Sequence, residues 1–95
     1  MNSRNLEIGS FVLSLKGRDD KISIVYKILD NNYVLTVNGK DKTFLNPKRK
    51  NIKHLLILDF NNFLLADKIK SGSKILDAEI RSAIKQAEQN LNLGG

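Results

Sequence analysis

The chain contains no cysteine and no tryptophan, and it has one histidine, one methionine and one proline among its 95 residues. Without cysteine, neither a disulfide bond nor a thiolate metal site can form, and a cytoplasmic protein is the simplest expectation. A single histidine without cysteine also cannot build a cluster of metal-ligating side chains. We therefore expect no metal site and no disulfide framework.

Long apolar segments and catalytic motifs are also missing. No run of about 18 apolar residues occurs, so we expect no transmembrane helix and no membrane partner. Residues 1–5 lead into no long apolar region, so we expect no signal peptide. The sequence has no Walker-type glycine loop, no cysteine nucleophile and no carboxylate partner beside His54. These absences favour a protein that is not an enzyme and needs no cofactor.

Positive charge is present in excess and is confined to the N-terminal part of the chain. The formal net charge is +6; residues 1–58 hold eleven Lys/Arg and five Asp/Glu, whereas residues 59–95 hold five of each. The densest cluster is the segment Lys48–His54, here called the basic tract, which contains four cations and a histidine. The apolar run Leu55–Leu58 follows it and should anchor it to a folded core. A concentrated basic segment of this kind is typical of proteins that bind an anionic polymer.

The first 58 residues have the periodicity and turn residues of β-structure. Short apolar or alternating segments predict five strands, namely Phe11–Leu15, Ile22–Leu29, Tyr33–Val37, Lys42–Leu45 and Asn51–Leu55. Between the third and fourth strands, Asn38-Gly39 predicts a type I′ hairpin turn. Five short strands within about 50 residues suggest a small barrel that closes its own edges.

The last 37 residues change to a helical period. A first helix is predicted by the apolar face Phe60, Phe63, Leu64 and Ile69, with Gly72 at its end. A second helix is predicted by Leu76, Ile80, Ala83, Ile84, Ala87 and Leu91. We expect Phe60 and Phe63 to pack between helix and barrel. The expected organisation is therefore a barrel with a basic edge over 1–58 and a helical extension over 59–95.

The segment Ile8–Asp19, a strand that runs into a glycine turn, resembles the start of a KOW domain. Together with Asn38-Gly39 and Pro47–Leu55, it resembles the KOW-containing ribosomal proteins of the eukaryotic and archaeal large subunit, in particular the fourteen-e type. It is even more similar to short bacterial proteins described as KOW-domain RNA-binding proteins, in which a helix starts like Asp77–Arg81. The resemblance implies an SH3-like (KOW) β-barrel followed by two helices. It also implies a ribonucleoprotein component in translation, binding ribosomal RNA of the large subunit.

Ten candidate RNA-binding residues follow from the resemblance and from the charge. The resemblance places them in the first turn and in the basic tract, and two lysines near the hairpin tip are auxiliary candidates: Lys16, Gly17 and Arg18; Lys48, Arg49, Lys50, Lys53 and His54; Lys40 and Lys42. Lysine offers a phosphate a point charge, whereas arginine offers it a bidentate fork.

Several of these assignments have a structural alternative. The basic tract can be a solvated loop, and His54 can be a structural histidine bonded to backbone. Gly17 can provide a positive φ or a close approach to RNA. Tyr26 and Tyr33 can stack on bases, although packing in the barrel core is the expected role of both. Strand alternation is expected to send Lys53 and His54 to opposite faces.

A protein-interaction module is the alternative function. SH3-like barrels also bind peptides, and NusG-type transcription elongation factors use a KOW domain to contact partner proteins. The neutral helical half could dock such a partner, including a neighbouring ribosomal protein. Binding to RNA predicts a steep dependence on salt, whereas an apolar protein interface predicts a weak one. We expect the free protein to be a monomer.

Overall fold

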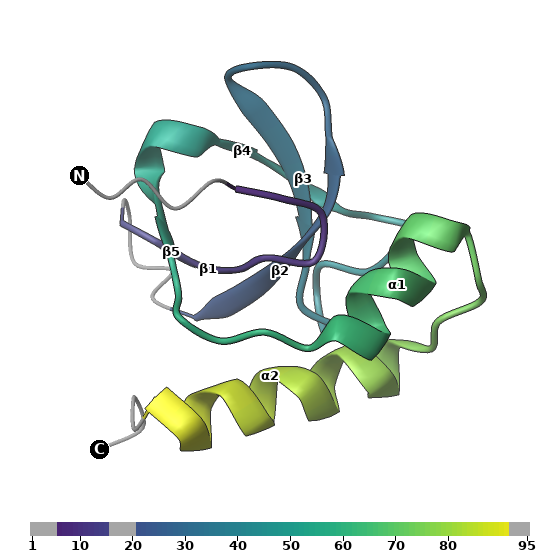
Figure 1. The fold of residues 1–95 in the computed structure, drawn as a ribbon. Coiled ribbons are helices and arrows are strands. Elements are labelled where there is room, and N and C mark those ends of the chain that lie inside the picture. The colour runs from purple at the N-terminus through teal and green to yellow at the C-terminus, as the bar shows by residue number, and fades with distance from the viewer. Residues whose placement is uncertain (1–5, 16–20, 92–95) are drawn as a thin grey trace.

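The computed structural model describes residues 6–15 and 21–91, which form five strands followed by two helices (Figure 1). In chain order the elements are β1 (Phe11–Ser14), β2 (Ile22–Ile28), β3 (Tyr33–Val37), β4 (Lys48–Asn51), the 3-10 helix η1 (Ile52–His54), β5 (Leu55–Ile57), α1 (Phe63–Ser71) and α2 (Asp77–Leu91). The order of strands before helices is the one expected from the change of period.

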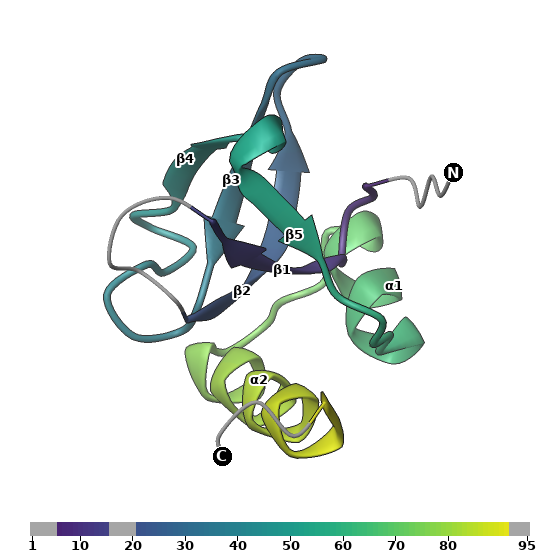
Figure 2. The same ribbon diagram turned by 90° about the vertical axis from the view of Figure 1, so that its left-hand side faces the viewer.

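The five strands form one antiparallel sheet in the order β4-β3-β2-β1-β5. The sheet is not closed into a barrel as expected, because β4 and β5 are its two edges. The prediction of a strand over Asn51–Leu55 is wrong, because η1 occupies its middle, β4 ends at Asn51 and β5 begins at Leu55. The cap of η1, Asn51, accepts a hydrogen bond from the Lys53 backbone N–H at 3.1 Å. Figure 2 shows how η1 turns the chain between the two short edge strands.

The connection between β3 and β4 is longer than the predicted hairpin. The prediction of a returning strand at Lys42–Leu45 is wrong, because this segment takes part only in an isolated bridge between Thr43 and Asn46. The strand that pairs with β3 is β4. The side chain of Asn38 organises the loop, because its Oδ1 accepts hydrogen bonds from the backbone N–H groups of Lys40 at 2.9 Å and Lys42 at 3.0 Å. Gly39 does adopt a positive φ of 78°. The Asn-Gly pair therefore marks a turn, but its side-chain hydrogen bonds favour a wider loop.

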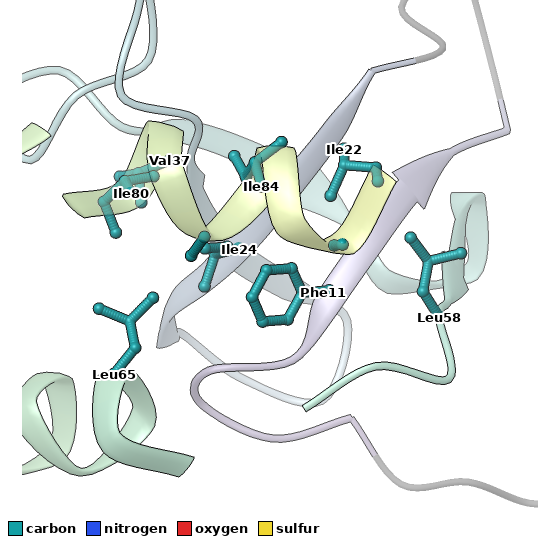
Figure 3. Close-up of a cluster of buried hydrophobic side chains, with 10 residues drawn as sticks. Phe11, Ile22, Ile24, Val37, Leu58, Leu65, Ile80 and Ile84 are labelled. Atoms are coloured by element: carbon teal, nitrogen blue, oxygen red, sulfur yellow. The ribbon is translucent and has the colours of Figure 1, made fainter. Parts of the chain in front are cut away.

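Apolar side chains gather on both faces of the sheet. The larger cluster joins the sheet to both helices and is drawn in Figure 3; its buried members are Phe11, Ile22, Ile24, Val37, Leu58, Leu65, Ile80, Ala83, Ile84 and Ala87. The smaller cluster on the other face contains Val12, Val25 and Val34, with Ile52 packed against it. Because the sheet and the helices share the larger cluster, the helices pack against one face of the sheet. The division of the chain into two parts at residue 58 stays a prediction.

Helix α1 begins after the cap Asn62, whose Oδ1 accepts a hydrogen bond from the Leu65 N–H at 3.0 Å. It ends at Gly72 with φ 76°, as the sequence predicts. Phe60 packs edge-to-face on Phe11 with ring centroids 4.9 Å apart, which confirms its expected role. Phe63 does not pack as expected: its side chain is 74% exposed, and Leu65 is the buried residue of this helix.

Helix α2 buries the four central residues that its apolar period predicts. At its start, Glu79 accepts a hydrogen bond from the Leu76 N–H at 3.0 Å and another from Lys68 of α1 at 2.8 Å. The hydrogen bond from Lys68 and then that from Leu76 lower the pKa of the Glu79 carboxyl. Neither helix is long and apolar enough to span a membrane, within the residues that the structure describes.

Candidate nucleic-acid interface

The basic tract forms the edge strand β4 and the turn η1 that follows it. In the pairing with β3, Lys48 lies opposite Thr36 and Lys50 opposite Val34, whereas Arg49 lies opposite Leu35. Directly opposite residues share a face of the sheet, so Lys48 and Lys50 lie on one face and Arg49 on the other. The edge of the sheet therefore carries cations on both of its faces.

Arg49 is held against an aromatic ring. Its guanidinium carbon lies 4.5 Å from the centroid of the Tyr33 ring, which is within the range of a cation–π interaction. Tyr33 is half-buried, so its ring is only partly accessible to solvent beside Arg49. This contact restricts the arginine side chain while its exposed fork stays available for a ligand.

Lys53 and His54 lie in η1, so the strand alternation expected for them does not apply. Lys53 is exposed and His54 is half-buried. The His54 carbonyl accepts a hydrogen bond from the Leu15 N–H at 2.8 Å, which ties η1 to the end of β1. The imidazole makes no hydrogen bond to any of residues 6–15 and 21–91. His54 thus contributes to the structure through the hydrogen bond of its backbone carbonyl and not through its imidazole.

Three cations of the basic tract have no carboxylate partner within the part of the chain that the structure describes: Lys48, Arg49 and Lys53. All three side chains are exposed. Lys50 differs, because it is half-buried and has an interaction of its own. The three exposed cations are the groups best placed to neutralise an anionic ligand.

The auxiliary lysines occupy the loop that leads to β4. The Lys42 ammonium lies 3.9 Å from the Asp41 carboxylate, and Lys40 is exposed. Hydrogen bonds from the Asn38 side chain and from backbone, with the nearby charge of Lys42, lower the pKa of Asp41. Asp41 is therefore ionised at neutral pH and weakens the positive field of this loop.

The first-turn candidates Lys16, Gly17 and Arg18 lie outside the described residues, and their part in binding stays a prediction. Tyr26 packs edge-to-face on Phe44 with ring centroids 4.9 Å apart, as expected for a core residue. No group of three or more histidine, aspartate or glutamate side chains that could hold a metal ion occurs among residues 6–15 and 21–91.

A surface pocket of about 330 Å³ lies beside the basic tract. It is lined by Asn31, Asn32, Tyr33, Asn51, Ile52 and Lys53. The Ile52 N–H donates to the Asn32 carbonyl at 2.8 Å, which fixes η1 against the turn between β2 and β3. Sequence analysis missed the asparagines of this pocket, because Asn31 and Asn32 have the signature of an ordinary turn and Asn51 is remote from them in the chain.

No family model matches the chain, but comparison with known proteins finds a distant similarity. Large ribosomal subunit protein eL14 of Hyperthermus butylicus is 26% identical over 83 residues, which cover 86% of this chain and 78% of that protein. The similarity supports the expected likeness to the fourteen-e type and does not support the bacterial assignment. This chain is thus distantly similar to a ribosomal protein of the large subunit.

Proposed function

We propose that the chain binds ribosomal RNA of the large subunit and that β4 with η1 forms the contact surface. The observation that carries the proposal is the set of three exposed cations, Lys48, Arg49 and Lys53, without carboxylate partners among the described residues. A rigid sheet edge with cations on both faces can contact the phosphates of a folded RNA. Selectivity would come from the shape of the RNA.

The distant similarity supports the same function. The similar protein is a component of the large ribosomal subunit, and the match spans most of both chains. The proposal keeps the KOW-type relationship expected from the sequence, with an open sheet in place of the closed barrel. The protein would act in the cytoplasm as part of a ribonucleoprotein particle, and a role of this kind requires neither catalysis nor a cofactor.

The arginine and the lysines would contribute in different ways. Arg49 is restricted by the Tyr33 ring, so its planar fork loses less side-chain entropy when it binds a phosphate. Lys48 and Lys53 are flexible point charges, which tolerate variation in the position of a phosphate. Together the three side chains would neutralise about three phosphates, with a corresponding dependence of affinity on salt.

Sedimentation through a sucrose gradient tests the proposal. Tagged protein in a lysate of its own organism should migrate with the large subunit at about 0.1 M salt and leave it as salt is raised to about 0.5 M. A tagged chain with Lys48, Arg49 and Lys53 all replaced by Gln should stay nearer the top at every salt concentration. Migration of the unmodified protein with the small subunit, or with neither subunit, would contradict the proposal.

A second candidate function, docking of a partner protein, is favoured by the exposed apolar residues of α1. The side chains of Phe63 and Leu64 are 74% and 79% exposed, although they adjoin the buried Leu65. A neighbouring ribosomal protein could cover them, in addition to RNA binding at β4. Replacing both exposed residues by Ser should then weaken attachment to the particle without changing the affinity of the purified protein for RNA.

A further inference from the structure

The pocket beside the basic tract has the features of a nucleotide site. We propose that it holds one unpaired nucleotide of the bound RNA, with the base against the asparagine amides and the adjoining phosphate on Lys53. This inference rests on the proposed function and deepens it, because it adds recognition of a base to the phosphate contacts of β4. The asparagines would then be as important for selectivity as the cations are for affinity.

The asparagine side chains have hydrogen-bonding capacity to spare. Those of Asn31 and Asn32 make no hydrogen bond within residues 6–15 and 21–91, and Asn51 uses its Oδ1 for the Lys53 N–H. Each amide can both donate and accept. A phosphate oxygen can only accept, whereas the edge of a base presents donors and acceptors side by side. Three amides around one pocket therefore match a base better than a phosphate.

The remaining walls of the pocket suit the flat face of a base. Tyr33 and Ile52 also line the pocket; both are half-buried and have largely apolar side chains. Ile52 is fixed by its packing on the smaller core cluster, and Tyr33 is fixed by its place in β3 and by Arg49. Stacking or apolar contact with a base contributes about 1–3 kcal/mol in proteins that bind single-stranded RNA. The pocket therefore offers contacts to both the face and the edge of a base.

The positive charge of Lys53 in the pocket agrees with binding of a phosphate next to the base. Lys53 lines the pocket and belongs to the same basic tract as Lys48 and Arg49, so a strand of RNA could pass from β4 into the pocket. Asp30 directly precedes the two asparagines of the pocket in sequence. Its Oδ1 accepts hydrogen bonds from the backbone N–H groups of Asn32 at 2.7 Å and Tyr33 at 2.9 Å. Asp30 thus shapes the turn that presents the asparagines.

RNA hexamers of adenosine, uridine or cytidine, and a hexamer of abasic ribose phosphate, test the inference. All four carry the same charge, so the ratio of their dissociation constants isolates the contribution of the bases. We expect at least one base-bearing hexamer to bind the full chain about fivefold or more tightly than the abasic one. The double variant Asn31→Ala, Asn32→Ala should reduce this ratio to below about twofold and leave the affinity for the abasic hexamer unchanged.

A matched control is the double variant Asn46→Ala, Asn90→Ala. These are also exposed asparagines whose side chains make no hydrogen bond within the described residues, but they lie away from the pocket, in the loop before β4 and in α2. The control should keep the full ratio. A second readout needs no variant: the side-chain amide NMR signals of Asn31 and Asn32 should shift with a base-bearing hexamer and not with the abasic one.

The outcomes separate this inference from the proposed function. Equal binding of base-bearing and abasic hexamers to the unmodified protein would overturn the nucleotide pocket, as would an unchanged ratio in the pocket variant. Absence of hexamer binding, with retained migration on the large subunit, would also overturn the pocket and leave the proposed function standing. Loss of that migration is the result that contradicts the proposed function itself.

Discussion

Replacement of Gly39 by Ala should destabilise the protein, because the loop before β4 approaches the start of α2 closely at this glycine. Gly39 has a φ of 78°, and a Cβ there would lie 2.6 Å from the carbonyl oxygen of Asp77 and 2.8 Å from Cγ of Arg81. The Arg81 guanidinium also donates a hydrogen bond of 2.6 Å to the Gly39 carbonyl. A shift of the loop to accommodate the methyl group would therefore disturb this hydrogen bond as well.

The expected cost can be divided into two parts. A left-handed φ costs a residue with a Cβ about 1–2 kcal/mol. Overpacking against backbone adds about 1–3 kcal/mol, since the Asp77 carbonyl is held in the first turn of α2. We therefore expect Gly39→Ala to lower the free energy of unfolding by about 2–5 kcal/mol.

Gly72→Ala is the matched control for the second part. Gly72 has nearly the same φ, 76°, but a Cβ there would meet no atom within 4 Å. Its replacement by Ala should lower the free energy of unfolding by about 1–2 kcal/mol, which is the cost of backbone strain alone. Urea unfolding followed by circular dichroism measures both variants, and a difference of about 1–3 kcal/mol between them is expected. Equal losses would refute the close approach of the loop to α2.

Two further predictions concern the same loop and the face of α1. Asn38→Ala should raise the pKa of Asp41 towards its ordinary value, as followed by NMR titration of the carboxyl, because Asn38 provides the largest of the interactions that lower it. The lowered pKa means that ionised Asp41 stabilises the fold above its ordinary pKa and that this contribution is lost as pH falls through the folded-state pKa. The difference in stability between parent and variant should therefore become smaller in acid, without vanishing, because the hydrogen bonds from the Lys40 and Lys42 N–H groups to Asn38 are lost at every pH; a difference that does not change with pH would contradict this. Leu65→Ala should lower the free energy of unfolding by about 2–5 kcal/mol, whereas Leu64→Ala should change it by less than about 0.5 kcal/mol; similar losses in urea unfolding would show that the buried face of α1 is different.

Strands with an apolar pattern could be predicted from the sequence nearly to the residue. Apolar or alternating segments between turn residues predicted β1 and β2 to within one residue at their ends, and they predicted the bounds of β3 as observed. β4 could not be found in this way, because Lys48–Asn51 contains no apolar residue. Its strand conformation depends on hydrogen bonding to β3, which is a tertiary interaction.

The buried face of α1 was harder to predict, because the sequence around its start contains several apolar residues that fit more than one helical face. Phe60, Phe63 and Leu64 fit one helical face, but the cap at Asn62 starts α1 only at Phe63. Leu65 then points to the core, and Phe60 packs on Phe11 from outside the helix. For α2 the period predicted the four buried residues Ile80, Ala83, Ile84 and Ala87. It was wrong for Leu76, which lies before the helix and is 56% exposed.

The candidate site was predictable in part, for reasons of charge. The density of cations in the basic tract indicated the sheet edge without knowledge of its pairing. The pocket was not predictable, because it forms where the turn at Asn31 and Asn32 meets Asn51 across the β3–β4 pair. Neutral amides in a turn give no signal of binding until the fold brings them together.

The dependence of RNA affinity on salt tests the central claim most directly. Large-subunit ribosomal RNA would be titrated with the parent protein and with the variant in which Lys48, Arg49 and Lys53 are replaced by Gln. A control variant with Lys70, Lys74 and Lys85 replaced by Gln loses the same charge from exposed positions in the helical half. We expect the log–log slope to become shallower by about 2–3 units in the first variant and to stay nearly unchanged in the control. Equal slopes in both folded variants would contradict the assignment of the RNA interface to β4 and η1.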